Sequence, residues 1–152
     1  MLWALVFLVG LIITHFMWLQ NLDEMAALWA WLIIILGANF SIGKSYGKKW
    51  PAEVAMSWNT VTALFIVLAG TMLLGVWPGG ATVFFALYFV LFGAAMFASS
   101  HEMKMSSGVT WGLIYVALGI VYPLWFVTAP FLAAGLILGL PMLIESSVKK
   151  KK

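Results

Sequence analysis

The chain has 152 residues, of which 64% are hydrophobic and 9% are charged, and its formal net charge is +3. A soluble domain has about 25% charged residues, so this sequence lacks the polar side chains needed to cover a water-exposed surface. The composition predicts an integral membrane protein whose main solvent is the lipid bilayer. The sequence contains no cysteine, which excludes disulfides and thiolate metal sites. Its basic residues are all lysine, so we expect no arginine-type phosphate recognition and no nucleic-acid binding.

Six apolar stretches follow one another along the chain, and each approaches the roughly 20 residues that a membrane-spanning helix needs. They cover residues 2–19, 25–42, 58–76, 81–98, 109–127 and 130–144. The first stretch has no Lys or Arg ahead of it, so we expect a retained helix rather than a signal peptide. The sequence predicts an all-α fold, a polytopic membrane bundle of six transmembrane helices in a single domain, with a short basic cytoplasmic tail at residues 145–152.

The lysines predict the orientation of this bundle. Six crossings place every lysine on one side, namely Lys44, Lys48, Lys49, Lys104 and Lys149 to Lys152. The opposite side receives Asp23 and Glu24. Because positively charged loops stay inside, we expect a multi-pass protein of the cell membrane with both termini in the cytoplasm.

The second half of the sequence contains a repeated pattern. Residues 58–98 and 109–144 each have a glycine-bearing apolar helix, a turn with proline, and a second glycine-bearing helix. The matching residues are Gly70, Gly75, Pro78 and Gly93 in one hairpin, and Gly119, Pro123 or Pro130, and Gly135 in the other. This pattern resembles the HdeD-like family of small six-helix membrane proteins. The resemblance implies a fold of three helical hairpins and supplies no catalytic residues.

Two pairs of glycines have the spacing that lets helices approach closely. They are Gly108 with Gly112, and Gly135 with Gly139, each separated by three residues. We interpret them as helix-packing residues, with association between membrane chains as one use.

Ionisable groups deep in a membrane usually mark chemistry, and here the middle of every predicted span lacks Asp, Glu, Lys and Arg. We therefore expect a protein that is not an enzyme and that holds no cofactor. His15 is the deepest ionisable residue. One interpretation makes it a haem or metal ligand or a pH-responsive pore residue. The other, which we favour, makes it a neutral histidine that is hydrogen-bonded to a neighbouring helix at the interface.

A second cluster of ionisable residues is predicted at the cytoplasmic boundary. His101, Glu102 and Glu145, together with Glu53, would form a divalent-metal site if the hairpins converge there. The alternative, which we favour, is an ordinary polar turn.

Uncharged polar residues form the last candidate set: Asn39, Asn59, Thr62, Tyr115 and Tyr122. Such side chains either join helices by hydrogen bonds or line a path for a small neutral solute.

Three functions remain open after these observations. The first is a non-catalytic accessory or oligomer-forming subunit of a membrane assembly. Its partners would be the lipid bilayer and either copies of the same chain or other membrane subunits. The first alternative is a channel or facilitator for a small neutral solute, and the second is a cofactor-binding electron-transfer subunit that uses His15.

Overall fold

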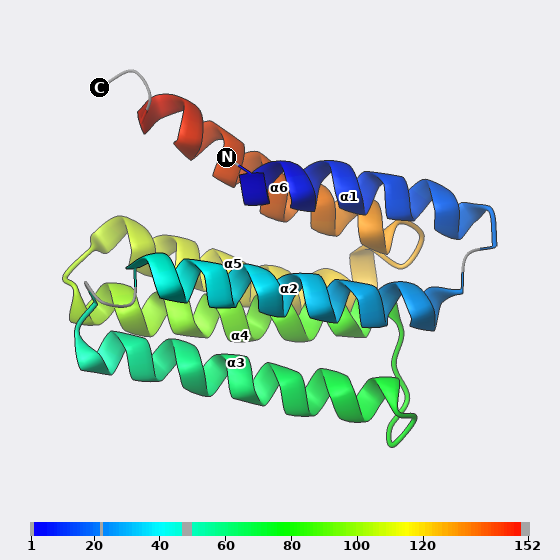
Figure 1. The fold of residues 1–152 in the computed structure, drawn as a ribbon, viewed down its shortest axis with the longest axis horizontal. Helices are drawn as coiled ribbons and strands as arrows, with labels where there is room; N and C mark the ends of the chain where they lie inside the picture. The colour runs from blue at the N-terminus through cyan, green and yellow to red at the C-terminus, as the bar shows by residue number, and fades with distance from the viewer. Residues whose placement is uncertain (1, 22, 47–49, 150–152) are drawn as a thin grey trace.

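In a computed structural model the chain forms six α-helices (Figure 1). They are α1 (Leu2–Leu19), α2 (Glu24–Tyr46), α3 (Ala52–Leu73), α4 (Ala81–Glu102), α5 (Ser106–Trp125) and α6 (Pro130–Lys149). The structure describes residues 2–21, 23–46 and 50–149. The described residues contain no β-strand, which confirms the all-α class.

Consecutive helices run in alternating directions (Figure 1). The ends of α1 and α6 that lead to the two termini lie at the same end of the bundle as the α2–α3 and α4–α5 connections. The α1–α2, α3–α4 and α5–α6 connections lie at the opposite end. Lys44 and Lys104 therefore share one end of the molecule, while Asp23 and Glu24 lie at the other.

Four helices of the described chain are long and apolar enough to cross a membrane: α2 over residues 24–41, α3, α4, and α5 over residues 107–125. The described parts of α1 and α6 contain shorter apolar segments, Ala4–Leu19 and Pro130–Pro141. The structure thus supports a helical membrane protein, and crossing by all six helices stays a prediction.

Several helices extend beyond the apolar stretches that the sequence defines. The clearest case is α3, which begins at Ala52 and not at Trp58. Pro51 precedes it with φ −53°, a value suited to the start of a helix. Glu53 in the first turn interacts favourably with the positive end of the helix dipole. The helix thus includes residues 52–57, which are mostly apolar, and Thr62 lies near the middle of α3.

The ends of α3 and α4 use the same hydrogen-bonded turn. At α3, Gly75 has φ +75°, and the Val76 and Gly75 amides donate to the carbonyls of Thr71 and Met72. At α4, Lys104 has φ +55°. The Met105 and Lys104 amides there donate to the carbonyls of Ser100 and His101. This pair of hydrogen bonds defines the Schellman motif, in which a helix ends at a residue in the left-handed conformation.

The closest helix pairs are α4 with α5, α1 with α6, and α3 with α4. Sequence analysis predicts three consecutive hairpins, and of these only α3–α4 is among the three closest pairs. Within the described residues α5 and α6 do not pack extensively on one another. The difference follows from the glycines of α5 and α6, which contact α4 and α1 respectively.

Helix α4 lies at the centre of the packing and contacts α2, α3, α5 and α6. Aromatic rings take part in its contacts with α3, α5 and α6. Phe84 meets Phe65 of α3 with ring centroids 5.4 Å apart, and Phe85 meets Phe131 of α6 at 5.7 Å. Phe89 stacks on Tyr115 of α5 at 6.1 Å. The middle of the bundle is therefore filled by side chains.

Candidate functional site

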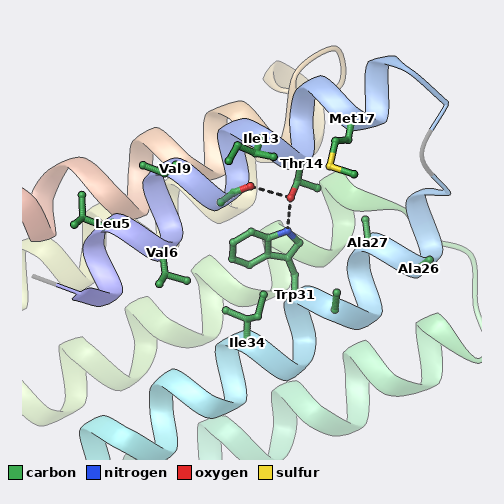
Figure 2. Close-up of a pocket in the computed structure, with 12 residues that line it drawn as sticks. Leu5, Val6, Val9, Ile13, Thr14, Met17, Ala26, Ala27, Trp31 and Ile34 are labelled. Atoms are coloured by element: carbon green, nitrogen blue, oxygen red, sulfur yellow. Dashed lines mark hydrogen bonds between the residues drawn. The ribbon is translucent and has the colours of Figure 1, made fainter.

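A groove of about 730 Å³ lies between α1 and α2 (Figure 2). It is lined by Leu5, Val6, Val9, Gly10, Ile13, Thr14, Met17, Ala26, Ala27, Ala30, Trp31 and Ile34. Nearly all of these side chains are apolar, so the groove suits an apolar occupant and not an ion.

The groove exists because α1 turns its other face to α6. Leu8 and Leu11 lie against Gly139 and Gly135 of α6. The groove-lining positions of α1 fall at spacings of three and four residues, which places them together on a different face. From Leu5 to Met17 these positions span roughly 18 Å along the helix axis, which exceeds one leaflet of a hydrocarbon core of about 30 Å.

Trp31 of α2 forms the floor of the groove (Figure 2). Its Nε1 donates to the Thr14 hydroxyl at 3.0 Å, and that hydroxyl donates to the Gly10 carbonyl at 2.9 Å. A Cβ added at Gly10 would lie 3.0 Å from the indole ring. The ring also stacks on Phe7 with centroids 6.1 Å apart. One indole thus links the two helices and keeps their backbones apart.

The two walls of the groove differ in size. On α1 the side chains of Leu5, Val9 and Ile13 are 40–52% exposed. On α2 the wall consists mainly of alanines, together with Trp31 and Ile34, and Ala26 and Ala30 are both exposed. Small residues on one wall and large apolar residues on the other make a surface onto which another helix can pack.

The predicted solute-path residues lie in three separate places. Asn39 and Thr62 line a small, partly open cavity of about 10 Å³ between α2, α3 and α4. Asn59 is exposed on the surface of α3. The Tyr122 hydroxyl donates to the Pro130 carbonyl, and the Tyr115 hydroxyl donates to the Ile137 carbonyl at 3.4 Å. The two tyrosines therefore join α5 to α6, as helix-joining side chains do.

His15 lies near the end of α1 that faces the α1–α2 turn and is 7% exposed. Its ring lies 5.9 Å from the ring of Trp18. Its Nδ1 is buried and has no hydrogen-bond partner among the described residues. His15 lines neither the groove nor the small cavity, and His101 lies at the opposite end of the bundle (Figure 1). A haem or metal at His15 therefore stays a prediction.

The predicted metal site begins at the exposed end of α4. His101 and Glu102 are both exposed there, ahead of the turn at Lys104, and Glu53 is exposed in the first turn of α3. The side chain of Glu145 lies outside the described part of the chain. Among the residues that the structure describes, no three His, Cys, Asp or Glu side chains gather closely enough to hold a metal ion. The segment around His101 is a helix-ending turn, and the metal site stays a prediction.

All four predicted packing glycines face helices of their own chain. A Cβ at Gly108 would lie 1.9 Å from the Ser100 Oγ, and one at Gly112 would lie 2.6 Å from the Phe97 backbone nitrogen. For Gly135 and Gly139 the nearest atoms are the Cβ atoms of Leu11 and Leu8, at 3.0 and 2.5 Å. These glycines are therefore used inside one chain, and association between chains needs another surface.

The sequence gives no direct sign of one further contact, which joins α2 to α4. An oxygen of Glu24 accepts a hydrogen bond of 2.5 Å from the Ala81 backbone nitrogen, at the first residue of α4. A Cβ at Gly80 would lie 2.6 Å from the same oxygen. Glycine in the Trp-Pro-Gly-Gly turn thus leaves room for a carboxylate that lies 57 residues away in sequence.

No protein-family model, curated protein or solved structure matches this chain. The resemblance to HdeD-like proteins accordingly remains a hypothesis, and functional inference depends on the geometry of the groove and the cavity.

Proposed function

We propose that this protein is a non-catalytic component of a membrane assembly and that the α1–α2 groove receives a transmembrane helix from another membrane chain. The groove is the observation that supports the proposal. It is apolar, opens sideways along α1, and is longer than one leaflet is deep. A helix that crosses the bilayer would contact it over this length.

A bulky side chain in the groove provides the test. Ala30 is exposed and lines the groove, so Ala30→Phe should block a docking helix. Ala94 is exposed on α4 and does not line the groove, which makes Ala94→Phe the matched control. We expect native mass spectrometry of mildly extracted protein to show a complex for the wild type and for Ala94→Phe, and its loss for Ala30→Phe. A complex that survives in Ala30→Phe would contradict the groove as the docking site.

A photoreactive side chain at position 30 identifies the occupant. We expect a crosslink to a polypeptide, either a second copy or another membrane chain, and a much weaker product from position 94. Crosslinks to lipid alone from position 30 would contradict the proposal.

We further propose that all six helices cross the membrane and that both termini face the cytoplasm. The shared location of Lys44 and Lys104 at one end of the bundle supports this orientation. Because the chain has no cysteine, single cysteines report topology without background. A membrane-impermeant maleimide applied to intact cells should label Gln20→Cys and spare Lys104→Cys. The reverse pattern would contradict the orientation.

A solute channel within one copy has less support. The rings of α3, α4, α5 and α6 pack against one another, and the cavity at Asn39 has room for about one water. A path for solutes would therefore have to form between copies. Liposomes that contain the protein should swell no faster than empty liposomes when they are challenged with urea or glycerol.

A further inference from the structure

The two walls of the α1–α2 groove complement each other in the size of their side chains. On α1 a row of large apolar side chains, Leu5, Val9 and Ile13, follows the groove and is 40–52% exposed (Figure 2). On α2 the small residues Ala26 and Ala30 line the groove and are exposed. Each wall is therefore the kind of surface on which the other could pack, if a second molecule presented it.

The large row and the small row also lie at matching levels of the bundle. Ile13 of α1 and Ala30 of α2 each lie about 9 Å along the axis from the helix ends that the α1–α2 turn joins. Leu5 and Gly37 each lie about 20 Å from those ends. Gly37 is exposed and lies seven residues from Ala30, on the same face of α2. Two large side chains of α1 thus each have a small residue of α2 at their own level.

A second copy of the chain would bring both rows to the groove in register. Copies of one chain insert in the same orientation, so the two-fold axis that relates them runs along the membrane normal and leaves every residue at its own level. Each large-on-small contact then forms twice, once in each groove. At the level between these contacts Val9 of one copy faces Ile33 of the other, and both side chains are apolar and exposed.

We propose that the helix received by the groove is α1 of a second copy, and that two copies form a symmetric dimer in which each α1 lies in the groove of the other. This inference rests on the function proposed above and names the occupant of the groove. Membrane helices associate through the fit of their surfaces, because lipid is as apolar as the side chains. A helix of another sequence would have to supply a large row at these levels, whereas this chain carries one on the neighbouring wall.

Exchange of large and small residues between two differently tagged copies provides the test. We expect wild-type copies to copurify after mild extraction. Copies that both carry Ala30→Phe should separate, because each new ring collides with Ile13 of the other copy. A copy with Ala30→Phe should copurify again with a copy that carries Ile13→Ala, since the shortened side chain makes room for the ring. Ile120→Ala, a matched change at an exposed position of α5, should not restore the pair.

Cysteines supply a readout that needs no bulky side chain. The chain contains no cysteine, so every disulfide reports the introduced residues. A copy with Ile13→Cys and a copy with Ala30→Cys should form a mixed disulfide under mild oxidation, because a disulfide requires Cα atoms within about 7 Å. Ile13→Cys paired with Ala94→Cys, at an exposed position of α4, should form none.

The outcomes separate this inference from the proposed function. A complex that depends on position 30 but contains one copy and another polypeptide would overturn the second copy as the occupant and leave the groove as a docking site. Copies that stay together when both carry Ale30→Phe would contradict the groove itself. Wild-type copies that do not copurify would overturn the dimer, as would the absence of both the rescue and the mixed disulfide.

Discussion

The α4–α5 pair and the α1–α2 pair are both joined by short turns, yet they pack in opposite ways. Between α4 and α5 the two backbones nearly touch: a Cβ at Gly93 would lie 2.6 Å from the Gly112 carbonyl oxygen. Between α1 and α2 the corresponding glycine, Gly10, faces the ring of Trp31 and not a backbone. The first pair is closed along its length, while the second leaves a groove of about 730 Å³.

The comparison shows that a glycine in a membrane helix does not by itself bring two backbones together. Close approach needs small residues on both helices, such as Gly93 and Gly112. The dispersion energy of many short contacts then stabilises the pair. When the facing residue is tryptophan, its indole ring fills the space that the absent glycine side chain leaves. The pairing of α1 with α2 then depends on the indole, through one hydrogen bond and its stack on Phe7, and it leaves surface for a partner.

A substitution that separates α4 from α5 should lower the free energy of unfolding more than the other changes that follow. In Gly112→Ala the new Cβ meets the Phe97 nitrogen at 2.6 Å and the Gly93 oxygen at 2.8 Å, and backbone atoms cannot move aside without separating the helices. We expect a loss of about 3 kcal/mol in the free energy of unfolding, measured by SDS titration in mixed micelles.

Gly70→Ala is the matched control for this prediction. Gly70 also lies within a helix, and nothing lies within 4 Å of the Cβ that alanine would add there. We expect no destabilisation in this variant. Since alanine favours a helix more than glycine does, equal losses in the two variants would show that the approach of α4 and α5 does not explain the result.

The Glu24 contact tests how the loosely packed helix α2 is held. Glu24→Ala removes the acceptor of the Ala81 amide and leaves the positive end of α4 without a partner. A hydrogen bond to a charged group typically contributes 1.5–3 kcal/mol, and because this carboxylate is partly exposed we expect about 1.5 kcal/mol of destabilisation. Glu24→Gln keeps an oxygen acceptor and should lose less in the same titration. An unchanged stability in Glu24→Ala would show that other contacts hold α2.

A substitution in the turn between α4 and α5 should stabilise the protein, which would increase the difference in stability between the α4–α5 and α1–α2 pairs. Lys104 adopts φ +55°, a left-handed conformation that costs most residues about 1 kcal/mol and glycine very little. Lys104→Gly should therefore raise the free energy of unfolding by about 1 kcal/mol. Lys104→Gln removes the charge but keeps the side chain, and we expect no gain from it. A similar gain in both variants would assign the effect to charge.

Much of the fold was predictable because apolar stretches and breakers are local signals. Trp-Pro-Gly-Gly separates α3 from α4 as expected, and each of the six predicted stretches lies mainly within one helix. The start of α3 was placed too late because Glu53 and Ser57 interrupt the otherwise apolar segment 52–57, which belongs to the helix and to its apolar span. The choice of helix partners was also hidden, because glycine spacing shows that a helix packs closely and not which helix it meets.

The candidate sites were predicted less well, and the physical reason is distance in sequence. Thr14 and Trp31 are 17 residues apart, and no periodicity within either helix indicates that they bond. Asn39 and Thr62 belong to the set that was predicted either to join helices or to line a path for a solute. The structure places them together at a small, partly open cavity, and because α3 begins at Ala52, Thr62 lies near the middle of that helix. Tyr88 completes that cavity, and its position in an aromatic stretch gave no sign of it.

The smallest expected effect concerns the bond across the groove. Thr14→Val keeps the shape of the side chain but removes the acceptor of the Trp31 Nε1. Hydrogen bonds between membrane helices contribute about 0.6 kcal/mol on average, and we expect a loss of that size in SDS titration. Thr14→Ser retains the hydroxyl and should retain stability. Since the indole also stacks on Phe7, Trp31 should stay in place, and Trp fluorescence should change little in Thr14→Val. A loss comparable to that of Gly112→Ala would contradict the view that α1 and α2 are loosely joined, because a single side-chain bond would then stabilise their pairing as much as an entire glycine interface does.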